Sequence, residues 1–215
     1  MYTLFAYPNS YAMTAHSVLE ESGAAYEVNW VQIFTNQLDP EFKRISPHGR
    51  VPALRDKDIT IFETGAIAYY IAECHPDIDL IIKEGEPERA LFLQWFHYLA
   101  STLQPDVMIQ FHPEIYFPNN DQLQTQFRDM SLTRLAGVLD IIENNLSRGL
   151  YFCGSRRTII DYLFVMQAVW PEIFPHKITD YPNISDLVER LLSRPAVKRV
   201  YDLHMEKRKP PISAS

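Results

Sequence analysis

The sequence predicts an α/β domain with a mixed four-stranded sheet, followed by an all-helical domain. Three observations carry this prediction. Residues 2–30 pass from a strand-like to a helix-like and back to a strand-like pattern, residues 51–74 indicate a hairpin and then a helix, and residues 87–200 show helical spacing without strand alternation. With a short helix between the first two segments, the order is β-α-β-α-β-β-α, which places parallel and antiparallel strands in one sheet.

The first elements follow from apolar spacing and from chain-breaking residues. Residues 2–7 form a mostly apolar run, which indicates a buried strand. A helix is expected from Ala12 to Glu21, with Gly23 suited to its C-cap. Apolar and polar residues alternate over 26–30, which predicts the second strand. The segment 35–45 is expected to hold only a short or irregular helix.

A hairpin and a helix follow a turn at residues 47–49. Pro52 cannot donate a hydrogen bond to a strand ladder, so it belongs at the first position of a strand, and a cis bond before it is accessible. Residues 56–58 form the predicted hairpin turn and 59–62 its return strand. The pair Glu63-Thr64 then opens a helix, whose expected buried face consists of Ala66, Ile67, Tyr70, Ile71 and Cys74.

Prolines mark the end of the first domain. Pro76 ends the helix that Glu63-Thr64 opens, and Pro87 suits the first position of a new helix. We therefore expect a sheet domain at 1–76, a linker at 77–86 and a helical domain at 87–215.

The second domain is expected to be helical throughout. One helix carries its apolar residues within 91–103, and Pro105 must end or kink it. Thr158 and Asp161 fit a capping box, which starts a buried helix running to Val169. Further helices are predicted at 127–146, 184–192 and 195–200.

Composition excludes several classes of function. Apolar content of 47% and aromatic content of 13% fit a globular protein with ample core, and a net charge of −7 argues against nucleic acid or an anionic membrane as the main partner. Cys74 and Cys153 have no metal-ligand spacing, so no metal is expected and a reducing compartment fits them. No secretory signal pattern or membrane-spanning run is present, so we expect a cytoplasmic protein.

A two-part motif links the hairpin to a known family. Residues 47–54 read P-x-G-x-V-P-A-L, and residues 63–71 read E-T-x-A-I-x-x-Y-I. This pattern resembles the glutathione-binding half of cytosolic glutathione S-transferases. The resemblance implies a thioredoxin-like first domain, glutathione as co-substrate and a homodimer. It also implies that Pro52 is cis, that the Val51 main chain pairs with the cysteine of glutathione, and that Glu63 and Thr64 hold the γ-glutamyl end.

The glycyl end of glutathione also needs a partner. Its glycyl carboxylate needs a cation, and Arg50 is close enough in sequence to Val51 to be a candidate. A solvated arginine beside a turn is the alternative. His48 is expected to be exposed, and His16 to be packed or capping, rather than catalytic.

The chemistry of such a site requires a group that favours the thiolate. Lowering a thiol pKa by about two units takes roughly 2.7 kcal/mol of preferential thiolate binding. One hydrogen bond to a charged group contributes about 1.5–3 kcal/mol, so a single donor suffices. We expect this donor in the turn between the first strand and the first helix, where Ser10 is favoured, followed by Tyr11 and Asn9. The alternative is that these are ordinary turn residues.

The first helix also shows how this chain departs from its bacterial relatives. Residues 8–16 resemble the beta-class pattern P-G-S-C-S-L-[AS]-P-H, with Tyr11 in place of the cysteine. The His-Lys pair of that class falls on Gln104 and Pro105. Cysteine chemistry of the beta class is therefore not expected. Alignment to serine-type classes puts the activating serine at Asn9 or Ser10.

The electrophile is expected where the two domains meet, a usual place for apolar pockets. The candidate wall follows the Pro105 break and consists of Phe111, Ile115 and Tyr116, with Phe117 nearby, alongside Tyr11 from the first domain. A role in closing the helical core is an equal alternative for these residues.

The sequence therefore predicts a glutathione transferase that attacks a small apolar electrophile, as in detoxification. One alternative is a glutathione-dependent disulfide or peroxide reductase, which needs the same thiolate. The other is a non-catalytic glutathione-binding or protein-partner module, a reading supported by the missing beta-class residues.

Overall fold

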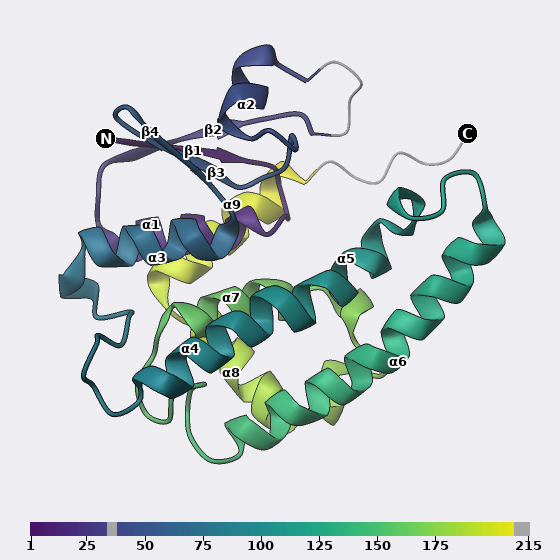
Figure 1. Ribbon diagram of the computed structural model, residues 1–215. Coiled ribbons are helices and arrows are strands. Elements are labelled where there is room, and N and C mark those ends of the chain that lie inside the picture. Colours follow the sequence, from purple (N-terminus) through teal and green to yellow (C-terminus); the bar gives the residue numbers. More distant parts are fainter. Residues whose placement is uncertain (34–37, 209–215) are drawn as a thin grey trace. The chain divides into compact units, whose positions relative to one another are not determined.

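The computed structural model describes residues 1–33 and 38–208. The chain forms two compact units: Met1–Ile81 together with the chain from Leu192 onward, and Ile82–Leu191. Figure 1 shows the course of the chain, with the strands near the N-terminus and helices beyond. Each unit has its own layers and core.

Unit 1 contains the predicted four-stranded mixed sheet. Its strands are β1 (Tyr2–Ala6), β2 (Tyr26–Trp30), β3 (Ala53–Asp56) and β4 (Ile59–Phe62), in the spatial order β2-β1-β3-β4. β1 and β2 are parallel, whereas β3 pairs antiparallel with both β1 and β4. The predicted thioredoxin-like arrangement is confirmed.

Helices cover both faces of this sheet (Figure 1). α1 (Ala12–Ser22) and α3 (Thr64–Cys74) pack together on one face, and the short α2 (Pro40–Ile45) lies on the other. Gly23 caps α1 in the left-handed conformation, at φ 65°, as its position predicted. On the α2 face, the buried cluster consists of Phe5, Phe42, Ile45 and Ala53. Of the segment predicted as irregular, residues 35–37 lie outside the described residues.

The buried face of α3 differs from the predicted one. Ala66 and Cys74 are exposed and Tyr70 is half-buried. The buried residues are Thr64, Ile67, Ala68, Ile71 and Ala72, which lie three, four, seven and eight positions along from Thr64. Two alanines in this set present little side chain where α3 packs against α1. The predicted set shares Ile67 and Ile71 with the observed one, but its other members come from the neighbouring side of the helix.

Unit 2 is helical, as predicted, with α4 (Arg89–Tyr98), α5 (Gln104–Phe111), α6 (Asp121–Leu146), α7 (Ile159–Ala168) and α8 (Pro182–Leu192). A π-helical segment, Leu99–Leu103, joins α4 to α5. Pro105 lies in the first turn of α5 and has no main-chain N–H to donate, so the irregular turn falls just before it. The predicted capping box is also present at the start of α7.

The last helix lies in unit 1 rather than with the other helices of the C-terminal half. α9 (Pro195–Lys207) packs against α1. The predicted division into 1–76, 77–86 and 87–215 differs from the structure in this respect, because helical spacing does not show which domain a helix packs against. Among the described residues, no helix is long and apolar enough to cross a membrane.

Candidate glutathione site

Three segments with predicted roles converge at one edge of the sheet. β1 and β3 pair with Phe5 opposite Ala53, and β3 and β4 pair with Ala53 opposite Phe62. Continued by two residues, the first pairing places Tyr7 opposite Val51. Continued in the same way, the second pairing places Val51 opposite Thr64. The turn after β1, the residues before β3 and the start of α3 therefore share this edge, which lies wholly within unit 1.

The loop that leads into β3 is organised by a buried serine. Ser46 is 2% exposed, and its hydroxyl donates to the carbonyl oxygen of Arg50 at 2.8 Å and accepts from the main-chain N–H of Arg50 at 3.1 Å. Gly49 donates its N–H to the carbonyl of Ser46 at 2.8 Å and adopts φ 63°. A Cβ on Gly49 would collide with the side chain of Leu38. The predicted turn is confirmed, and the role of Ser46 was missed because serine is common in any turn.

Val51 presents its main chain at the edge. The Val51–Pro52 peptide bond is cis, as the resemblance implied, and Pro52 is buried. β3 begins only at Ala53, and among the described residues no partner is recorded for the main-chain N–H or C=O of Val51. A donor and an acceptor on one extended residue can pair with another peptide in the manner of a strand.

Glu63 and Thr64 lie where α3 begins. Glu63 is the N-cap residue, with φ 78° and ψ 117°, and its exposed carboxylate forms no cap hydrogen bond with α3 and has no recorded partner in the described part of the chain. Thr64 is 7% exposed. The first N–H groups of a helix lack intrahelical acceptors and favour negative charge. This corner therefore offers an anionic group beside donors suited to an anion, as an amino acid zwitterion requires.

The turn after β1 holds the three candidate thiol activators. Asn9 adopts φ 50°, and Tyr11 is the half-buried N-cap residue of α1. The Ser10 hydroxyl donates to the carbonyl oxygen of Tyr7 at 2.6 Å and accepts from the N–H of Ala12 at 3.3 Å. The proton of Ser10 is thus held by the main chain, and the hydroxyl must rotate before it can donate to another group.

The exposed residues near this edge include the cation predicted for the glycyl carboxylate. Arg50 is exposed, with no recorded side-chain partner in the described part of the chain, and His48 is exposed as expected. His16 is 1% exposed and hydrogen-bonded within unit 1, so it is a packed residue, as predicted.

The residues predicted for the electrophile wall lie in unit 2, apart from Tyr11 of unit 1. Phe111 ends α5, and its ring packs edge-on against Trp170 at 5.3 Å between centroids. Ile115 and Tyr116 are 55% and 51% exposed, in the segment that follows α5. The Tyr116 ring lies edge-on to Phe127 at 5.2 Å. Ile115 and Tyr116 thus expose apolar surface, whereas the rings of Phe111 and Tyr116 also pack against other residues of unit 2.

A separate hollow lies on the α2 face of the sheet. It has a volume of about 340 Å³ and is lined by residues from β1, β2 and β3 and from α2 and the segment before it, including Phe5, Trp30, Phe42 and Arg55. None of the residues predicted to contact glutathione is among those that line it. Its walls mix aromatic rings with an ion pair between Arg55 and Glu41, at 3.1 Å. The peptide-like edge at Val51, rather than this hollow, fits the predicted ligand.

The two units and this sheet edge define a two-domain protein with a thioredoxin-like domain and a helical domain. A family model of the glutathione S-transferase N-terminal domain matches residues 1–73, and one of the C-terminal domain matches residues 104–195. Glutathione S-transferase F13 of Arabidopsis thaliana is 32% identical over 188 residues, covering 85% of this chain and 86% of the relative. The chain therefore belongs to the glutathione S-transferase family.

Bacterial proteins are also similar to this chain. Glutathione S-transferase GstA of Escherichia coli O157:H7 is 26% identical over 199 residues, covering 91% of this chain and 94% of the relative. The crystal structure of a glutathione transferase homologue from Sulfitobacter, with bound glutathione, has a TM-score of 0.85 at 25% identity, covering 95% of this chain and 99% of that chain. Because plant and bacterial relatives both match, the bacterial subtype stays a prediction.

Proposed function

We propose that this protein binds glutathione at the Val51 edge of the sheet and activates its thiol for attack on a small apolar electrophile. One observation carries the proposal most directly. The Val51 main chain, the Glu63 carboxylate and the start of α3 share one edge of the sheet, and neither the Val51 main chain nor the Glu63 carboxylate has a recorded hydrogen-bond partner among the described residues.

Each part of glutathione has a counterpart at this edge. The cysteinyl main chain pairs with the N–H and C=O of Val51, as an added strand pairs with a sheet. The γ-glutamyl ammonium pairs with Glu63, and its carboxylate takes the Thr64 hydroxyl and the N–H groups that begin α3. Arg50 receives the glycyl carboxylate. This assignment uses both charges at one end of the tripeptide and the single charge at the other.

We assign thiol activation to the turn that follows β1. Ser10 must break its hydrogen bond to Tyr7, which costs about 0.5–1.5 kcal/mol, and it then gains a hydrogen bond to a charged sulfur worth about 1.5–3 kcal/mol. The exchange is favourable only when a thiolate is present. Ser10 thus stays our first candidate, with Tyr11 and Asn9 as the other donors of the turn.

A small apolar electrophile needs apolar side chains to bind it. We assign it to the exposed Ile115 and Tyr116 and the half-buried Phe111 and Tyr11, since accessible apolar and aromatic side chains suit a small apolar molecule. We also expect a homodimer in the cytoplasm. The homodimer is implied by the family resemblance, and the cytoplasmic location is the expectation drawn from the sequence pattern.

A non-catalytic glutathione-binding or protein-partner module is the second candidate. The hydrogen bond from Ser10 to Tyr7 favours it, because this bond occupies the proton that activation would need. A cysteine-dependent disulfide or peroxide reductase is less favoured, since neither Cys74 nor Cys153 lies in the turn.

The ultraviolet absorbance of the glutathione thiolate distinguishes these candidates. We expect a saturated complex to show thiolate at a pH about two units below that needed for free glutathione. Ser10→Ala, Tyr11→Phe and Asn9→Ala should identify the donor, because one of them should remove this shift while glutathione still binds. A bound thiol that titrates like the free one would favour the non-catalytic module.

A further inference from the structure

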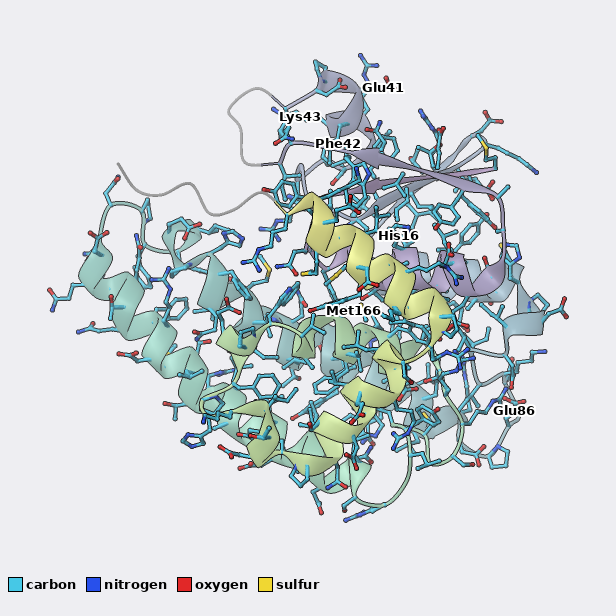
Figure 2. The ribbon with its side chains drawn as sticks, turned by 180° about the vertical axis from the view of Figure 1, so that it is seen from behind. His16, Glu41, Phe42, Lys43, Glu86 and Met166 are labelled. Atoms are coloured by element: carbon cyan, nitrogen blue, oxygen red, sulfur yellow. The ribbon has the colours of Figure 1, made fainter. Side chains whose placement is uncertain are left out.

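A pair of buried histidines joins α9 to α1. His16 lies in the middle of α1 and His204 in the last turns of α9, and they are 1% and 0% exposed. Figure 2 shows His16 beside α9. The Nδ1 atom of His16 lies 3.1 Å from the Nε2 atom of His204. Two imidazoles at this distance can share only one proton between them, so one nitrogen donates and the other accepts.

The neighbouring groups fix the direction of this hydrogen bond. Tyr26 donates its hydroxyl proton to the carboxylate of Glu20 at 2.5 Å. The Tyr26 oxygen must then accept from Nε2 of His16, which lies 3.0 Å away. A neutral His16 therefore has no proton on Nδ1, and His204 donates from Nε2. The chain of donors runs from His204 through His16 and Tyr26 to Glu20.

This arrangement leaves the last nitrogen without a partner. Nδ1 of His204 is buried and has no hydrogen-bond partner among the described residues. A proton added there would be a buried donor without an acceptor, and a proton added to Nδ1 of His16 would face the N–H of His204. Either protonation therefore places a positive charge where the surroundings do not satisfy it.

The charged groups recorded near the pair in the described part of the chain lie on α1 and α9. Glu20 of α1 faces Tyr26 of β2 and also accepts from Arg199 of α9, at 2.7 Å. Lys207 of α9 lies over the ring of Trp30 at 5.3 Å, and Trp30 is in ring contact with His204 at 4.9 Å. The buried face of α3, which packs on α1, carries Thr64, Ile67, Ala68, Ile71 and Ala72 and no titratable group.

We propose that the His16–His204 pair makes the attachment of α9 to α1 sensitive to acid, so that its C-terminal half loosens as the pH falls below about 6. The N-terminal half of α9 is held by ion pairs instead, through Arg194 and Arg199. The loosening therefore starts at the end that carries His204. This inference does not depend on glutathione binding.

The pKa values of the two histidines set the pH range in which α9 is expected to loosen. Burial, opposed by the charge of Glu20, lowers the pKa of His16 to about 4, and burial with the charge of His16 lowers the pKa of His204 to about 3. Although burial acts to raise it, hydrogen bonds from Tyr26 and Arg199 hold the pKa of Glu20 below its usual value.

The direction of the pH effect on the attachment of α9 follows from proton binding. A released histidine has a pKa of about 6.5, so the open form binds more protons than the closed form between pH 6.5 and 4, and the attachment weakens as the pH falls. One histidine with these two pKa values favours opening by roughly 20-fold between pH 7 and pH 5. The second histidine adds to this factor.

Hydrogen–deuterium exchange of the full chain tests the proposal. We expect protection of the amides in the C-terminal half of α9, corrected for the intrinsic pH dependence of exchange, to fall at least about tenfold from pH 7 to pH 5. Protection in α6 should change less than about twofold over the same range. The double variant His16→Gln/His204→Gln removes both titrating groups and should make α9 behave like α6. His176→Gln, at an exposed histidine of unit 2, should keep the wild-type response.

Two results would overturn the proposal. One is an α9 whose protection is as insensitive to pH as that of α6, and the other is a double variant that keeps the wild-type loss. If circular dichroism shows that the double variant does not fold, NMR titration of the wild-type imidazoles decides instead. Rings that stay neutral until α9 loosens support the proposal, and rings that titrate near pH 6.5 in the intact fold contradict it.

Discussion

Arg194 and Glu21 form a two-point ion pair across 173 residues of sequence, with Nε to Oε1 at 2.6 Å and Nη2 to Oε2 at 2.8 Å. Glu21 lies in the last turn of α1 with a side chain only 9% exposed, and Arg194 is the N-cap residue of α9. The pair therefore fixes the point at which the chain returns from unit 2 to unit 1. A planar guanidinium suits this geometry, which a lysine cannot reproduce.

Replacing Arg194 should destabilise unit 1. Arg194→Ala leaves a mostly buried carboxylate without its main cation, so we expect the free energy of unfolding to fall by about 1–3 kcal/mol. Arg199→Ala is the matched control, because the Arg199–Glu20 pair is more exposed, at 61% and 22%, and should cost under about 1 kcal/mol. Urea unfolding followed by circular dichroism measures both. Equal losses of unfolding free energy for the two substitutions would show that the burial of Glu21 does not strengthen its ion pair with Arg194.

The capping box of α7 should contribute more to the free energy of unfolding than a surface carboxylate does. Asp161 is fully buried, and it accepts from the N–H of Thr158 at 2.7 Å and from the N–H of Phe152 at 3.0 Å. Asp161→Ala leaves both donors buried without an acceptor, so we expect a loss of about 2–4 kcal/mol in the free energy of unfolding. Asp186→Ala, at an exposed position of α8, should change it by less than about 0.5 kcal/mol. A tolerated Asp161→Ala would show that the donors find other partners.

The two cysteines should differ sharply in reactivity. Burial, together with the charge of Asp161, raises the pKa of Cys153 to about 12, whereas Cys74 is exposed at the end of α3. Only the thiolate reacts with a disulfide reagent, so we expect one fast-reacting thiol per chain in the native protein and two after denaturation. In the Cys74→Ser variant the fast phase should disappear. Rapid reaction of both thiols in the native state would mean that unit 2 opens readily.

The sequence was most informative where the backbone itself is constrained. Pro47 and Gly49 predicted the turn, because proline restricts φ and glycine can adopt the positive φ found at Gly49, and the family resemblance implied the cis bond before Pro52. Thr158 and Asp161 predicted the start of α7, since their spacing satisfies two main-chain donors at once. These signals depend only on residues that are close in sequence, so one sequence is enough to recognise them.

The features that the sequence did not reveal depend on contacts between distant residues. Nothing near Pro195 shows that α9 packs on α1, because Arg194 and His204 meet partners near the N-terminus. The hydrogen bond from Ser10 to Tyr7 likewise depends on a rotamer that spacing does not fix. The electrophile wall stays a prediction for the same reason.

The Glu63 carboxylate is proposed to hold the γ-glutamyl end of glutathione, and calorimetry of glutathione binding measures its contribution. Glu63→Gln removes the carboxylate proposed to pair with the γ-glutamyl ammonium but keeps a side chain of the same size. Glu73→Gln is the matched control, because it makes the same change at an exposed position near the other end of α3.

We expect wild-type protein and Glu73→Gln to bind glutathione equally, and Glu63→Gln to bind it about 10- to 100-fold more weakly, as the loss of a charged hydrogen bond requires. A wild-type protein that releases no heat with millimolar glutathione, or a Glu63→Gln variant that binds as tightly as Glu73→Gln, would contradict the account.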